Sequence, residues 1–161
     1  MTASTMKGEG SVSLEENKAI IQGLFEAFNK HNLDLLDGFI APDFVDHTLQ
    51  LQGLDSFKKS EAMFIKSFPD YSETIEDIVA EGDRVWVHFK VTGTHTGEWD
   101  FFGIPFPPTG KKITYTGVGI WRVVNGKVVE RRSVRDLLDF LKQLGVIEPT
   151  EKAKKLFPED V

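Results

Sequence analysis

The sequence contains no cysteine, and this absence excludes disulfide bonds, thiolate zinc sites and cysteine nucleophiles. It also lacks any apolar run of about 18 residues, so we expect no transmembrane helix. The N-terminus lacks the basic start and apolar core of a secretory signal peptide. We therefore expect a cytoplasmic protein with no membrane partner.

Positive charge is scarce as well, because 19 basic residues stand against 25 acidic ones and the net charge is −6. Such an acidic chain lacks the electrostatic surface that binds nucleic acids, so we expect no nucleic-acid partner. The length of 161 residues is typical of one globular domain. Thirteen phenylalanines are many for this length, and they indicate either a deep aromatic core or a pocket for a small hydrophobic molecule.

Helical patterns dominate the N-terminal part of the chain. Ser13 and Glu16 have the spacing of a capping box, and the apolar residues that follow recur at helical intervals. Pro42 is expected to stop a second, shorter helix. After the first helix we therefore expect a helix at 33–40, a short strand at 44–48 and a helix at 55–68.

From residue 70 onward the pattern changes to alternation, which is typical of strands. The pair Asn125-Gly126 predicts a two-residue hairpin turn. Residues 96–110 are rich in glycine, proline and phenylalanine, and they predict a long loop at a functional mouth or lid. The expected elements are strands at 72–80, 84–95, 111–124 and 127–135, followed by a helix at 137–144.

Helices followed by an antiparallel meander indicate an α+β fold rather than a parallel α/β sheet. We expect a curved antiparallel sheet, covered by three N-terminal helices, that forms a cone with one open end. The domain is expected to span 13–147, with a flexible tail at 1–12 and a charged tail at 148–161.

The hairpin turn also predicts which side chains share a face of the sheet. A regular two-residue turn places Asp136 opposite Tyr115 and Arg132 opposite Gly119, all on one face. Arg131 and Arg135 then lie on the other face. Gly117 and Gly119 mark either the floor of a pocket or a bulge, and a bulge would shift this pairing by one residue.

Several short motifs, in this order, are similar to those of a known family. The chain resembles the SnoaL-like polyketide cyclases, or ester cyclases, of the nuclear-transport-factor-2-like superfamily. The motifs are Ala41-Pro42-Asp43-Phe44-Val45-Asp46-His47, Ser67-Phe68-Pro69-Asp70, Glu81-Gly82-Asp83-Arg84-Val85, Gly93-Thr94-His95-Thr96-Gly97, Pro108-Thr109-Gly110-Lys111, Asn125-Gly126-Lys127-Val128-Val129-Glu130 and Gln143-Leu144-Gly145.

This resemblance implies a cystatin-like cone and an intramolecular aldol condensation that closes the last ring of an aromatic polyketide ester. It implies no metal and no cofactor. The family's acid/base aspartate matches Asp136 by its position after the Glu130 motif. The chain departs from the family at Arg132, where members often have a tryptophan.

The chemistry of the candidates leaves alternatives open. Asp136 is either a general acid/base in a dry pocket or the N-cap of the following helix. His95 and His47 could polarise a carbonyl or relay a proton, or they could be structural. Arg132 either pairs with Glu130 or binds an anionic group of the ligand. Tyr115 could orient the Asp136 carboxylate.

The remaining expectations concern the apolar contacts and the partners. Trp121, Phe89 and Phe102 are candidate substrate contacts. No two histidines stand at i, i+4 and there is no cysteine, so we expect no metal site. Apolar residues on the outer sheet face predict a homodimer or a dimer of dimers. The alternatives to a cyclase are a non-catalytic ligand-binding or dimerisation module and a dehydratase or isomerase of the same fold.

Overall fold

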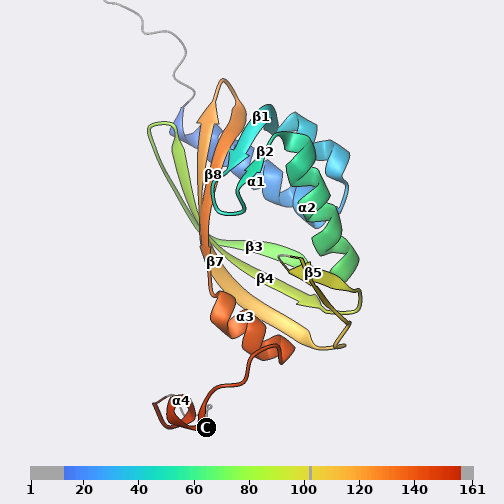
Figure 1. Ribbon diagram of the computed structural model, residues 1–161. Coiled ribbons are helices and arrows are strands. Elements are labelled where there is room, and N and C mark those ends of the chain that lie inside the picture. The colour runs from blue at the N-terminus through green and yellow to red at the C-terminus, as the bar shows by residue number, and fades with distance from the viewer. Residues whose placement is uncertain (1–12, 102, 157–161) are drawn as a thin grey trace, which may run out of the picture.

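The computed structural model describes residues 13–101 and 103–156 (Figure 1). The helices are α1 (Leu14–Asn29), the 3-10 helix η1 (Leu33–Gly38), α2 (Leu54–Ser67), α3 (Leu137–Leu144) and α4 (Glu151–Leu156). The strands are β1 (Ile40–Asp46), β2 (Leu51–Gln52), β3 (Ser72–Glu81), β4 (Arg84–Thr94), β5 (Trp99–Phe101), β6 (Ile104–Phe106), β7 (Lys112–Val124) and β8 (Lys127–Arg135). The tail predicted at 1–12 lies outside the described residues, and the tail predicted at 148–161 contains α4.

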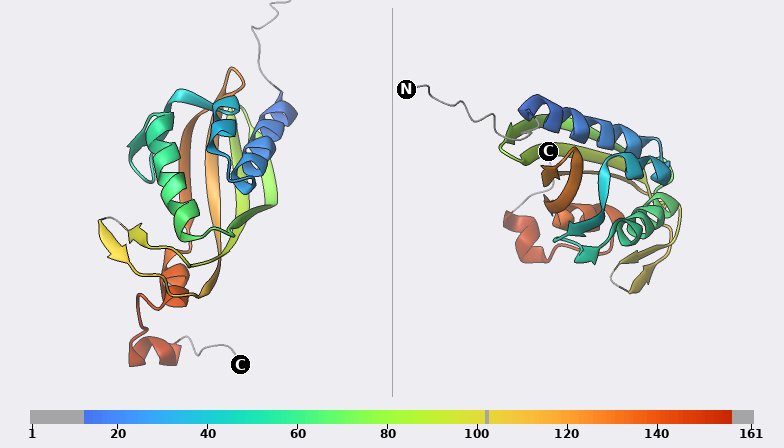
Figure 2. Two further views of the ribbon diagram at one scale, coloured as in Figure 1. Left: turned by 90° about the vertical axis from the view of Figure 1, so that its right-hand side faces the viewer. Right: turned by 90° about the horizontal axis from the view of Figure 1, so that it is seen from above.

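The main sheet has the strand order β2-β1-β8-β7-β4-β3. β1 and β8 run parallel, whereas the pairs β2–β1, β8–β7, β7–β4 and β4–β3 are antiparallel. The sheet is strongly curved, and α1 and α2 lie over its concave side (Figure 2). This arrangement confirms the predicted α+β fold with a curved sheet beneath N-terminal helices. The sheet was predicted to be antiparallel throughout, and the parallel pairing of β1 with β8 corrects that expectation.

The ends of two helices match the sequence patterns closely. The Ser13 N–H donates to Glu16 Oε2 at 2.7 Å, and the Glu16 N–H donates to Ser13 Oγ at 3.2 Å, so the capping box is complete. Gly145 ends α3 with φ of 74°, a left-handed conformation that glycine adopts at little cost. Both features depend on neighbouring residues only, which is why a local pattern predicts them.

Three expected elements differ in the structure. The strand predicted at 44–48 is β1, which begins at Ile40 and ends at Asp46. The helix predicted at 33–40 ends at Gly38, and Pro42 lies within β1, where the pairing with β8 is irregular between Ile40 and Val45. Because no regular ladder bond is required there, a residue without an N–H fits. The loop predicted at 96–110 contains the two-stranded sheet of β5 and β6.

The register of the β7–β8 hairpin was predicted wrongly beyond its first two pairs. Val124 pairs with Lys127 and Val123 with Val128, but Arg122 then pairs with Glu130, so Val129 is an extra residue in β8. A bulge of this kind shifts every later pair by one residue and moves side chains to the opposite face. Arg131 and Arg135 therefore face the concave side, and Arg132 is exposed on the convex side.

The two glycines of β7 make room for aromatic rings of the core. A Cβ atom at Gly117 would lie 2.7 Å from Phe89 Cζ, and one at Gly119 would lie 2.7 Å from Trp121 Nε1. Both rings are buried, and each lies 6.2 Å from the ring of Phe25 in α1. These glycines are therefore neither the floor of a pocket nor the site of the bulge.

A buried ion pair joins β1 to β8 inside the core. The Arg131 Nε–H donates to Asp46 Oδ2 at 2.7 Å, and Asp46 is fully buried. Asp46 Oδ1 also accepts the backbone N–H groups of Thr48 and Leu49, both at 2.9 Å. The Arg131 guanidinium lies 4.7 Å from the centroid of the Phe57 ring, at a distance typical of a cation–π contact.

Candidate active site

A cavity of about 250 Å³ lies between α2, the β3 and β7 strands and the start of α3. Its aromatic wall is closely packed, because Tyr115 and Trp99 both meet the Phe140 ring edge-on, with centroids 5.2 and 5.1 Å apart. Other apolar residues complete the lining: Leu49, Leu51, Met63, Phe64 and Leu137. An aromatic, mostly apolar cavity with a few polar groups is the usual form of a small-molecule site.

Asp136 lies at the edge of this cavity, directly after β8. It is the N-cap of α3, because its Oδ1 accepts the backbone N–H of Asp139 at 3.0 Å. The other oxygen, Oδ2, has no hydrogen-bond partner among the described residues. Asp136 is therefore the predicted N-cap, and its second oxygen remains available to a ligand. The residue is exposed at the cavity edge rather than enclosed in the dry pocket that we expected for an acid/base.

Tyr115 lies in the same cavity wall as Asp136, although the two residues are not paired across strands as predicted. Tyr115 pairs with Val91 of β4 and is buried. Burial raises the pKa of the Tyr115 phenol, so the group stays protonated and can donate a hydrogen bond.

Three further ionisable side chains, none of them predicted as site residues from the sequence, line the cavity. Glu61 comes from α2, Glu73 from β3 and Arg135 from β8. None of them has an oppositely charged partner within 4.0 Å among the described residues, and the Arg135 Nε is buried without a hydrogen-bond partner. The cavity thus holds potential hydrogen-bond donors and acceptors that the protein itself leaves unpaired.

Burial strongly perturbs these groups. Burial, and then the neighbouring Glu61, raises the pKa of Glu73 to about 7. Burial also raises the pKa of Glu61, although Arg131 and Arg135 partly offset the increase. Burial lowers the pKa of Arg135, but the surrounding acidic groups outweigh this effect and the net change is upward. At neutral pH, Arg135 is therefore charged, and Glu73 retains a substantial part of its proton occupancy.

The sequence contains signals that could have predicted the inward orientation of the two glutamates, namely the helical period of α2 and the alternation of β3. Glu61 follows the buried Phe57 by four residues and precedes the cavity-lining Phe64 by three, so it lies on the apolar side of α2. Glu73 and Ile75 are both half-buried, whereas the intervening Thr74 is exposed. Arg135 could not have been placed in this way, because its face depends on the bulge at Val129.

The model of the SnoaL-like polyketide cyclases matches residues 18–144 of the chain. The chain belongs to this family. Curated relatives include the aklanonic acid methyl ester cyclase DauD of Streptomyces sp. (strain C5), which is 25% identical over 86% of this chain and 88% of its own length. The nogalonic acid methyl ester cyclase of Streptomyces nogalater is 25% identical over 76% of this chain and 92% of its own length.

This SnoaL-like cyclase is also similar to solved structures. AclR of Streptomyces galilaeus, proposed to be a hydroxylase, is 32% identical, with a TM-score of 0.73 over 84% of this chain and all of that chain (100%). IdmH of Streptomyces antibioticus, proposed to be a polyketide cyclase, is 33% identical, with a TM-score of 0.66 over 80% of this chain and 98% of that chain. The predicted family, fold and cyclase character are therefore confirmed.

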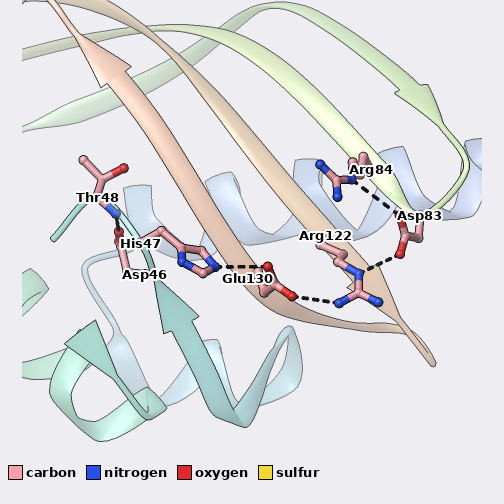
Figure 3. A network of polar contacts seen from close by, with 7 residues as sticks. All are labelled: Asp46, His47, Thr48, Asp83, Arg84, Arg122 and Glu130. Atoms are coloured by element: carbon pink, nitrogen blue, oxygen red, sulfur yellow. Dashed lines mark hydrogen bonds and ion pairs between the residues drawn. The ribbon is translucent and has the colours of Figure 1, made fainter. Parts of the chain in front are cut away.

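In this SnoaL-like cyclase, His47 lies away from the cavity. Its Nε2 is 3.0 Å from Glu130 Oε2, in a network on the convex side of the sheet (Figure 3). Glu130 also accepts from Arg122 Nη1 at 2.7 Å, and the Arg122 Nε–H donates to Asp83 at 2.7 Å. Because the bulge places Glu130 opposite Arg122, the acid is paired without Arg132.

Arg132 is exposed and lies near Ile120, Arg84 and Arg122 on the convex face. The expectation that it shares a face with Tyr115 is wrong, because that expectation assumed a regular hairpin. The arginine that reaches the cavity is Arg135.

His95 is fully buried beneath the cavity's aromatic residues rather than in the lining. Its ring stacks on Phe68 with centroids 5.0 Å apart, and its Nδ1 accepts the Thr109 N–H at 3.3 Å. Burial lowers the pKa of the imidazole, so the ring is neutral at pH 7. These contacts fix the segment that returns from β6 towards β7.

Two of the three predicted apolar contacts, Phe89 and Trp121, are also outside the cavity lining. Phe89 and Trp121 belong to the core beside the glycines of β7. Phe102 lies outside the described residues. Within residues 13–101 and 103–156, no group of three or more histidine, aspartate or glutamate side chains could hold a metal ion. None of the helices in that part of the chain is long and apolar enough to cross a membrane.

Proposed function

We propose that the protein is a cofactor-free cyclase that closes a ring by intramolecular aldol condensation on a hydrophobic, carbonyl-bearing small molecule. The observation that carries the proposal is Asp136, whose Oδ1 is held at the N-terminus of α3 while its carboxylate lines an aromatic cavity. The match of Asp136 to the acid/base aspartate of the family, by its position after the Glu130 motif, supports the same assignment. The names of the curated relatives favour an aromatic polyketide methyl ester as substrate.

In this mechanism the free carboxylate oxygen of Asp136 removes a proton from the carbon next to a carbonyl group. The resulting enolate carbon attacks a second carbonyl carbon of the same molecule, and the new carbon–carbon bond closes the ring. The alkoxide that forms then takes the proton back from the Asp136 carboxyl. One carboxyl thus serves both steps, and we expect Tyr115, which lines the same cavity, to donate a hydrogen bond to an oxygen that becomes negatively charged.

Asp136→Asn tests this role because the asparagine Oδ1 can still cap α3. The substrates are aklanonic acid methyl ester and nogalonic acid methyl ester, and the ring-closed product is measured by chromatography. We expect the turnover rate to fall about 10²- to 10⁴-fold in Asp136→Asn. Asp139→Asn is the matched control, since Asp139 lies in the same turn but not in the cavity lining. If Asp136→Asn turned over these substrates as fast as the wild type, the assignment would be contradicted. If the wild-type protein bound the substrates but did not convert them, a non-catalytic module would be favoured.

We further propose that the convex face of the sheet mediates self-association as a homodimer or a dimer of dimers. Trp86 is 44% exposed and Val134 is 77% exposed, and the partly exposed Val118 pairs with Val134 across β7 and β8. Trp86 pairs with Ile120 in the neighbouring strand, so these apolar side chains form a continuous patch. A cytoplasmic location likewise remains a proposal.

A further inference from the structure

We infer that Glu61, Glu73 and Arg135 form a recognition site for a neutral ligand that carries both a carbonyl oxygen and a hydroxyl group. The inference rests on the proposed function only in placing the ligand in the same cavity. The inference concerns ligand binding rather than turnover. It can therefore fail while the cyclase mechanism stands, and the cyclase mechanism can fail while the inference stands.

The contrast between two arginines on one strand supports this site. Arg131 and Arg135 lie four residues apart in β8 and both face the concave side. The Arg131 guanidinium already has partners within the protein, because it donates a hydrogen bond to Asp46 and lies over the Phe57 ring. Arg135 has no ion pair among the described residues, and its buried Nε lacks a partner. Because leaving a buried donor unpaired is costly, an unpaired arginine at a cavity indicates a group that a ligand satisfies.

The chemistry of the three side chains defines what the ligand must offer. A guanidinium has only N–H donors, so Arg135 requires an acceptor oxygen such as a carbonyl. A glutamate carboxylate accepts a hydrogen bond from a hydroxyl, and a protonated glutamate can also donate one. The three side chains come from α2, β3 and β8, so they can contact separate parts of one ligand.

The charge balance favours a neutral ligand over a carboxylate. Arg135 is the cation in the described lining, and Glu61, Glu73, Asp100 and Asp136 are its acids. Even if neither glutamate carried a charge, the two aspartates would outnumber the single positive charge. An anionic ligand would therefore add like charge to a partly buried site. We therefore expect a neutral ligand at Arg135 instead of the anion that the sequence suggested for Arg132.

Three matched naphthalene probes separate these requirements. Methyl 6-hydroxy-2-naphthoate carries a carbonyl and a hydroxyl, methyl 2-naphthoate lacks the hydroxyl, and 6-hydroxy-2-naphthoate is the anion of the same size. Binding is measured by calorimetry near pH 7 on the full chain. We expect the hydroxy ester to bind about tenfold more tightly than either of the other two probes, as one satisfied hydrogen bond or one avoided repulsion would give.

Variants then assign the effect to residues. Arg135→Met should weaken binding of the hydroxy ester about tenfold, and Glu73→Gln or Glu61→Gln should reduce its advantage over methyl 2-naphthoate. The matched controls are Arg132→Met, on the convex side of the same strand, and Glu76→Gln, which lies on β3 and pairs with Lys90. Both controls should bind like the wild type. If Arg135→Met proves unstable, Arg135→Lys retains the charge without the planar donor group and should still weaken binding.

Three results would overturn the inference. The first is tighter binding of the naphthoate anion than of the hydroxy ester. The second is an equal effect of Arg135→Met and Arg132→Met. The third is an absence of binding of all three probes to the wild type. Loss of turnover in Asp136→Asn with these affinities unchanged would leave both proposals standing, whereas unchanged turnover in that variant would remove the cyclase mechanism alone.

Discussion

Replacing Glu73 by glutamine should make the protein less sensitive to pH. Glu73 lines the cavity from β3. The titratable groups near it are Glu61 of α2, Tyr115 of β7, and Arg131 and Arg135 of β8. Its pKa rises from 4.5 to about 7 on folding, mainly because it is buried. Between these two values the folded state holds a proton that the unfolded state releases, so raising the pH favours unfolding. Glutamine has no proton to lose.

This pKa change sets an upper limit of about 3 kcal/mol on the stability that the wild type loses as the pH rises through this range. Glu73 is only half-buried by its accessible surface, so solvent screening reduces the effect. We therefore expect Glu73→Gln to exceed the wild type by about 1–2 kcal/mol above pH 7. In a domain of this size that corresponds to a melting temperature about 2–8 °C higher.

Urea and thermal unfolding at a series of pH values from about 5 to 8 measure this difference. The two proteins should have similar stabilities near pH 5, where Glu73 is protonated and resembles glutamine, and should diverge as the pH rises. Glu76→Gln is the control, because Glu76 is exposed on the same strand and contacts Lys90 at 3.2 Å. A constant offset between Glu73→Gln and the wild type, or a wild type that gains on the variant as the pH rises, would refute the reasoning.

Two further predictions concern the core and the convex face. Arg131→Met leaves the fully buried Asp46 without its cation, so urea unfolding should show a loss of about 3–5 kcal/mol, and adding Asp46→Asn should recover part of it. A loss below about 1 kcal/mol in the single variant would show that the pair contributes little. Trp86→Glu should convert the proposed dimer to a monomer in native mass spectrometry, because it places a charge in the apolar patch. An unchanged oligomeric mass would place the interface elsewhere.

Features that depend on adjacent residues could be predicted from the sequence. The capping box at Ser13 and the left-handed Gly145 are local, and both are present. Strand β4 was predicted almost to its ends, because its buried and exposed residues alternate strictly from Arg84 onward. The β5–β6 hairpin was missed because its strands are short, although Asp100 Oδ1 accepts the Gly103 N–H at 2.6 Å in its turn.

Features that depend on distant contacts could not be predicted in the same way. Val129 carries no signal that distinguishes it from its neighbours in an alternating run. The bulge there is compatible with the parallel pairing of β1 on the other side of β8, which places Glu130 beside Val45 and Arg131 beside Asp46. Such a partner lies more than 80 residues away in the chain, and Asp46 and Arg131 meet only in the folded sheet.

The one-residue shift also determines the chemistry of the cavity. Without the bulge, Arg132 would face the cavity side of the sheet and Arg131 would lie on the convex side, where Asp46 could not reach it. With the bulge, Arg131 reaches a buried carboxylate and Arg135 reaches the cavity next to Asp136. An arginine could not remain in the fully buried position without Asp46, whereas the position of Arg135 leaves room for a ligand to supply the acceptor. The bulge at Val129, which could not be predicted from the hairpin sequence, therefore brings Arg135 to the cavity, where we assign it to ligand recognition.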